Sequence, residues 1–127
     1  MPEQERKDKG VADNPRYEGE NVRTIVELRR AVSAKLDEVR AALVDDLDIP
    51  IGTYNVIMDL SEKLEKMLYC NTQFCILGNP LAYAYDFAED MESLAWMSGD
   101  HQLTRMCHTV GRLIYNFVFR PKADEDE

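Results

Sequence analysis

The chain has 127 residues, 45% of them apolar, and a formal net charge of −9 at pH 7. That length and apolar share are enough for one domain with a buried core. The apolar runs are only a few residues long, which excludes a membrane span of about 20 residues. Because no secretory leader precedes the three cysteines, we expect a cytoplasmic protein.

The acidic charge is unevenly distributed along the chain. Residues 21–36 and residues 101–120 each carry a net charge of +3, whereas residues 37–100 carry −10. We therefore expect an electrically two-ended molecule rather than a uniformly acidic one.

The two ends of the chain are predicted to lie outside the fold. Residues 1–20 are charged, contain proline and glycine and have few apolar side chains, which is typical of a flexible N-terminal arm. Residues 121–127 form an acidic tail. The sequence thus predicts a single helical bundle domain over residues 21–120.

The first predicted helix starts with Asn21 as N-cap and ends at Ile49-Pro50, because a residue before proline is disfavoured in the helical region. Its apolar positions, spaced by three and four, are Val22, Ile25, Leu28, Val32, Leu36, Val39, Leu43 and Leu47. The second predicted helix starts at Thr53, and its pattern is compatible with continuation through residues 70–77. Its core positions are Val56, Ile57, Leu60, Leu64, Met67 and Leu68.

The third predicted helix has the clearest boundaries in the chain. Gly78-Asn79-Pro80 supplies a stop, an N-cap and a proline at the first helical position, and Ser98-Gly99 ends the helix. Asp100 then caps the fourth helix, in which Gly111 suggests close approach of another backbone. The apolar stripe of that helix is Leu103, Met106, Cys107, Val110, Leu113, Ile114, Phe117 and Val118. Four helices with short connections predict an all-α, antiparallel four-helix bundle.

Residues 81–97 carry apolar side chains on nearly every side of the third helix. Three other helices of so short a chain can hardly enclose it, so we expect some of these side chains to contact a second molecule. The predicted interface residues are Tyr83, Phe87, Trp96 and Met97. A homodimer is the simplest assembly that would cover them.

A cationic face is predicted on the fourth helix. His101, Arg105, His108, Arg112 and Tyr115 recur at spacings of four and three, which places them on one side. Arginine binds phosphate and carboxylate groups through two parallel hydrogen bonds, so Arg105, His108, Arg112 and Tyr115 are candidate anion-binding residues. The alternative is a solvated face whose cations pair with acids of a neighbouring helix.

Two short acidic elements could hold a metal ion. They comprise Glu62, Glu65, Asp86, Glu89 and Asp90. The spacing resembles the paired acidic motifs of magnesium-dependent all-α nucleotide pyrophosphohydrolases, in which carboxylates hold Mg²⁺ against substrate phosphates. That resemblance implies a nucleoside triphosphate pyrophosphohydrolase with Mg²⁺ as its cofactor. Ordinary surface charge is the alternative.

The sequence favours a non-enzymatic protein–protein interaction module, a small regulator, adaptor or inhibitor that needs no cofactor. Its expected partners are a second copy of itself and another protein, with nucleic acid not expected as a direct ligand. Besides the hydrolase, one further alternative is an acidic inhibitor of phage type that imitates nucleic acid. The phosphate surrogates would be Asp37, Asp45, Asp46, Asp48, Glu89, Asp90 and Glu92.

Overall fold

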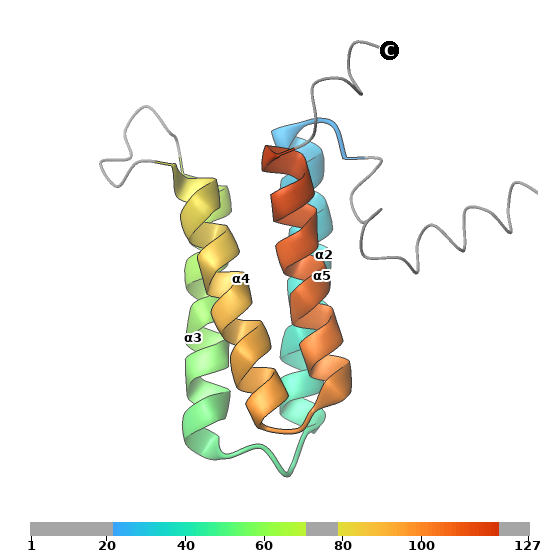
Figure 1. Ribbon diagram of the computed structural model, residues 1–127, viewed down its shortest axis with the longest axis vertical. Coiled ribbons are helices and arrows are strands. Elements are labelled where there is room, and N and C mark those ends of the chain that lie inside the picture. The colour runs from blue at the N-terminus through green and yellow to red at the C-terminus, as the bar shows by residue number, and fades with distance from the viewer. Residues whose placement is uncertain (1–21, 71–78, 120–127) are drawn as a thin grey trace, which may run out of the picture.

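The computed structural model describes residues 22–70 and 79–119, and these form four helices (Figure 1). They are α2 (Ile25–Asp45), α3 (Ile51–Leu68), α4 (Pro80–Met97) and α5 (His101–Val118). Helix α4 packs against α3 and α5, and α2 closes the ring by packing against the same two helices. Successive helices run in opposite directions, which confirms the predicted all-α, antiparallel four-helix bundle.

Two predictions concern only residues outside the described ranges. They are the N-terminal arm of residues 1–20 and the acidic tail of residues 121–127. The predicted continuation of the second helix through residues 70–77 is wrong where it can be followed, because α3 ends at Leu68 and Cys70 is not helical; residues 71–77 lie outside the described ranges. Within the described part of the chain, no helix is both long and apolar enough to cross a membrane.

Two of the predicted N-caps are observed in the structure, and a third is not. Asn79 and Asp100 are N-caps as predicted, and their side chains accept hydrogen bonds from the backbone N–H groups of Leu81 and Leu103. The predicted cap of the first helix is wrong, because Thr24 caps α2. The Thr24 hydroxyl accepts from the N–H of Glu27, whose carboxylate accepts in return from the N–H of Thr24. This reciprocal capping box satisfies two backbone donors at once.

The connection between α2 and α3 also differs from the prediction. Helix α2 ends at Asp45, four residues before Ile49, and the carboxylate of Asp46 accepts a hydrogen bond from the N–H of Asp48. Such a local bond competes with continuation of a helix, so the chain turns here. Helix α3 begins at Ile51 rather than at Thr53, since the N–H of Tyr54 already donates to the carbonyl of Pro50.

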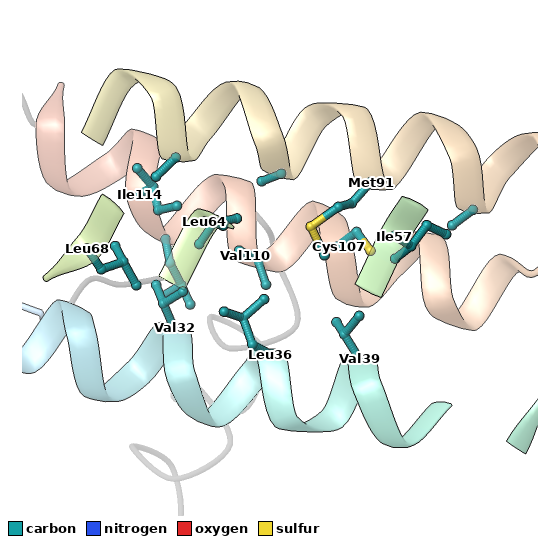
Figure 2. Close-up of a cluster of buried hydrophobic side chains, with 14 of the residues drawn as sticks. Val32, Leu36, Val39, Ile57, Leu64, Leu68, Met91, Cys107, Val110 and Ile114 are labelled. Carbon is teal, nitrogen blue, oxygen red and sulfur yellow. The ribbon is translucent and has the colours of Figure 1, made fainter. Parts of the chain in front are cut away.

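The core contains one stripe of buried side chains from each helix, and Figure 2 shows these stripes meeting between the helices. Helix α4 contributes mainly small side chains, namely Ala84, Ala88 and Ala95, together with Met91. Apart from Met91, the large residues of α4 therefore lie beside or outside the core, which explains how a helix with apolar residues all around fits a four-helix ring. Val56 of α3, predicted in the core, is instead 47% exposed.

Gly111 is buried against α4, and the atoms of that helix nearest to an added β-carbon are side-chain atoms. A β-carbon added to Gly111 would lie 3.6 Å from the Cβ of Ala88 and 3.7 Å from the Cε1 of Tyr85, which are ordinary side-chain contacts. Because glycine lowers helix stability relative to alanine, Gly111→Ala should raise the free energy of unfolding by about 0.5–1 kcal/mol. Chemical denaturation would measure the change, and a loss of stability would mean that the α4–α5 packing cannot take the added methyl group.

Candidate interaction surface

The four predicted interface residues do not form one surface. Phe87 is half-buried and packs against the core, while Tyr83, Trp96 and Met97 are 39%, 62% and 74% exposed. Tyr83 and Trp96 are thirteen residues apart on α4, which corresponds to about 20 Å along the helix axis. Only Trp96 and Met97 lie close together in the sequence, in the last turn of α4.

Trp96 and Met97 share their end of the bundle with three other exposed apolar side chains. Because the helices are antiparallel, the end of α2, the start of α3 and the end of α4 meet at the lower end of Figure 1. We call the five residues there the apolar end patch. They are Val44 (61% exposed), Leu47 (93%), Ile51 (73%), Trp96 (62%) and Met97 (74%).

Sequence analysis missed three members of the apolar end patch. Leu47 continues the spacing of the α2 stripe and was therefore predicted in the core, although the helix ends two residues before it. Ile51 lies between the predicted end of the first helix and the predicted start of the second, and Val44 lies one residue after the buried Leu43. One signal in the sequence could have indicated their exposure. In residues 43–51 the apolar residues are interrupted by aspartates, and a fully buried segment would not contain these acids.

Acidic side chains surround a groove at the same end of the bundle. The groove, which we call the acidic groove, has a volume of about 630 Å³ and lies between the last turns of α2 and the α4–α5 turn. Its apolar lining includes Ala41, Ala42 and Met106. The carboxylates that line it are Glu38, Asp45, Asp46, Asp48 and Asp100.

Two of these carboxyl groups interact directly. Burial raises the pKa of Asp100, and the neighbouring carboxylate of Asp46 raises it further. The hydrogen bond with Asp100 conversely lowers the pKa of Asp46, and a second one from the N–H of Asp48, 2.9 Å away, acts in the same direction. The interaction thus moves the two pKa values apart, with the raised pKa on Asp100 and the lowered one on Asp46.

Replacing Asp100 by asparagine should therefore stabilise the fold in a pH-dependent way. The pKa of Asp100 is raised in the folded chain, so this residue lowers stability increasingly as the pH rises above its unfolded pKa. Asparagine caps α5 equally well and carries no charge. Unfolding curves should show a larger gain at about pH 7 than at about pH 4. The exposed control Asp90→Asn should show no such difference, and an equal gain at both pH values would contradict the prediction.

Trp96 places an aromatic ring beside the acidic groove. Its ring centroid lies 5.4 Å from that of His101, a groove residue, in an edge-on arrangement. Trp96 is the only tryptophan of the chain. Its fluorescence therefore reports on this end of the bundle alone.

The candidate anion-binding residues are largely engaged by neighbouring side chains. The Nδ1 atom of His108 lies 3.2 Å from both carboxylate oxygens of Glu92 on α4. Arg112 donates to Asn116 at 3.2 Å and lies over the ring of Tyr115, 4.7 Å from its centroid. Arg105 is exposed. This arrangement fits the alternative of a solvated face better than a preformed anion site.

The candidate metal ligands are not gathered into one site. Glu65 accepts hydrogen bonds from Arg40 of α2, at 2.9 Å, and from Ser33, also at 2.9 Å. Glu62, Asp86, Glu89 and Asp90 are exposed. Among the described residues, no group of three or more His, Cys, Asp or Glu side chains could hold a metal ion. Burial also raises the pKa of the Cys107 thiol to about 12, so this sulfur is not a nucleophile at neutral pH.

Comparisons of the chain with protein-family models, with curated proteins and with solved structures find no match.

Proposed function

We propose that this protein is a non-enzymatic interaction module that binds another protein through the apolar end patch. The observation that carries the proposal is the exposure of five large apolar side chains at one end of the bundle, including a tryptophan and a methionine. Aromatic residues and methionine are enriched at protein interfaces, and grouped exposed apolar side chains mark interaction sites. A regulator, adaptor or inhibitor would use such a surface without catalysing a reaction.

The negative charge at this end of the bundle opposes the homodimer expected from the sequence. In a two-fold symmetric dimer, the same patch of both copies meets itself. Asp45, Asp46 and Asp48 would then face the same residues of the second copy, and like charges opposite each other oppose association. This repulsion favours a different protein as the partner over a second copy.

A photo-activated cross-linker tests the proposal in the source cell. We would place p-benzoylphenylalanine at Leu47, in the apolar end patch, and at the exposed Ala34 of α2 as the control. A discrete cross-linked product is expected from position 47 and not from position 34. A product with twice the mass of the chain would instead identify the homodimer, and no product from position 47 would contradict the proposal.

Trp96→Ala separates binding from stability. Because Trp96 is 62% exposed, its truncation should change the free energy of unfolding by no more than about 0.5–1 kcal/mol. It should nevertheless weaken the cross-link from position 47 strongly, since a tryptophan at the centre of an interface carries much of the binding energy. A large loss of stability with unchanged cross-linking would instead assign Trp96 to the core.

A further inference from the structure

We infer that the partner presents a cationic amphipathic helix to the apolar end patch and the acidic groove. The inference rests on the proposed function and names the chemistry of the partner. The two surfaces lie at the same end of the bundle and both draw on α2 and on the region around the α4–α5 turn. An apolar face of the bound helix would cover the patch while its lysine or arginine residues reach the groove.

Among the described residues, four of the five groove acids have no lysine or arginine as an ion-pair partner. Glu38 forms a 3.2 Å ion pair with Lys35. No lysine or arginine in the described part of the chain forms an ion pair with Asp45, Asp46, Asp48 or Asp100. A cation brought by the partner would therefore meet four carboxyl groups, among them the neighbouring pair Asp46 and Asp100.

The apolar lining of the acidic groove suits the stem of a long basic side chain. Ala41 and Ala42 of α2 and Met106 of α5 contribute apolar surface to the groove that the carboxylates also line. Lysine and arginine bury their aliphatic stems against such surface while their charged heads stay at a polar rim. The groove thus combines the two surface properties that one basic side chain can satisfy.

A helical partner segment fits this end better than an extended one. An extended peptide usually binds by adding a strand to a sheet edge, whereas an amphipathic helix binds a groove between helices. Residues 22–70 and 79–119 contain no strand that could offer such an edge. The same carboxylates repel nucleic acid and anionic lipid, which disfavours both as ligands of this surface.

Trp96 fluorescence provides a direct test with synthetic probes. The first probe is a peptide of about 18 residues, five helical turns, with leucine on one face and lysine on the other and without tryptophan. The second has the same leucine face and glutamate in place of lysine. The leucine–lysine peptide should shift the emission of Trp96 to shorter wavelength and saturate. Its Kd should rise at least about tenfold between roughly 50 and 500 mM salt, and the leucine–glutamate peptide should not bind.

A matched pair of double variants distinguishes the groove from net charge. Asp45→Asn with Asp48→Asn removes two groove charges, while Asp86→Asn with Asp90→Asn removes two charges from the exposed side of α4. The first variant should bind the leucine–lysine peptide about tenfold more weakly, and the second within about twofold of the unmodified chain. Circular dichroism would verify that both remain folded.

Three results would overturn the inference. They are equal binding of the two peptides, equal effects of the two double variants, and no binding of the leucine–lysine peptide. The proposed function is judged separately, by the cross-link from position 47 in the cell. A cross-link together with equal peptide binding would therefore retain the interaction surface and reject only the cationic partner.

Discussion

Replacing Leu36 by alanine should lower the free energy of unfolding by about 3 kcal/mol, whereas the same replacement at Leu47 should change it by less than about 0.5 kcal/mol. Leu36 is fully buried between the helices, and Leu47 is 93% exposed (Figure 2 shows Leu36). Removing the first side chain leaves a cavity in a packed interior, while removing the second only reduces apolar surface that already contacts water.

In a binding experiment, replacement of Leu47 should have the larger effect on affinity and replacement of Leu36 the smaller one. Leu47→Ala should reduce the affinity for the leucine–lysine peptide, because Leu47 is the most exposed member of the apolar end patch. Urea denaturation measures the stability of both variants, and Trp96 fluorescence measures binding. A loss of about 2 kcal/mol or more at Leu47 would show that this side chain packs within the fold and would remove it from the patch.

Local signals allowed much of the fold to be predicted from the sequence. Asn79, Pro80 and Asp100 act through atoms within a few residues of themselves, so their role as helix starts can be recognised without knowing the rest of the fold. Gly99 has a φ of 80°, a backbone conformation that glycine adopts readily, which explains the stop between α4 and α5.

The region between α2 and α3 was less predictable, for a physical reason. The spacing of Leu43 and Leu47 continues a helical stripe, but the turn at Asp46 removes Leu47 from it. Apolar periodicity cannot distinguish a residue that faces the core from one that lies just beyond the end of the helix. The apolar end patch was hidden from sequence analysis by this ambiguity.

The arrangement of α4 depends on its neighbours as well as on its own sequence. Its small residues Ala84, Ala88 and Ala95 face the core. In this orientation of the helix, Trp96 and Met97 are exposed. The sequence indicated that not every apolar residue of this helix could be enclosed. Which ones remain outside followed only from the packing of α3 and α5 against α4.

Polar contacts between helices could not be predicted from spacing at all. Arg40 and Glu65 are separated by twenty-five residues, yet the Nη2 atom of Arg40 lies 2.9 Å from a carboxylate oxygen of Glu65. The Nε of the same guanidinium donates to the hydroxyl of the buried Ser61 at 3.2 Å. The spacing of acidic residues makes Glu65 a candidate metal ligand, but spacing cannot reveal its hydrogen-bond partner on α2.

Arg40→Ala should destabilise the bundle by about 2 kcal/mol, although Arg40 belongs to no apolar stripe. The Arg40 side chain is 23% exposed and that of Glu65 is 32% exposed, so water only partly replaces the lost contacts. The substitution removes the guanidinium from both Glu65 and Ser61 at the α2–α3 interface. Guanidinium chloride or urea denaturation would measure the loss.

The ion pair between Lys63 and Asp59 is the matched control for Arg40. Its two side chains are 56% and 58% exposed and lie one turn apart on α3, so Lys63→Ala should cost only about 0.3–0.5 kcal/mol. Joint replacement of Arg40 and Glu65 by leucine should recover part of the loss, because, among the described residues, the only charged group then left without its ion-pair partner is Asp37, which is 79% exposed to water. Equal effects of Arg40→Ala and Lys63→Ala would show that the α2–α3 contact is fully solvated, and packing of the apolar stripes would then account alone for the pairing of these helices.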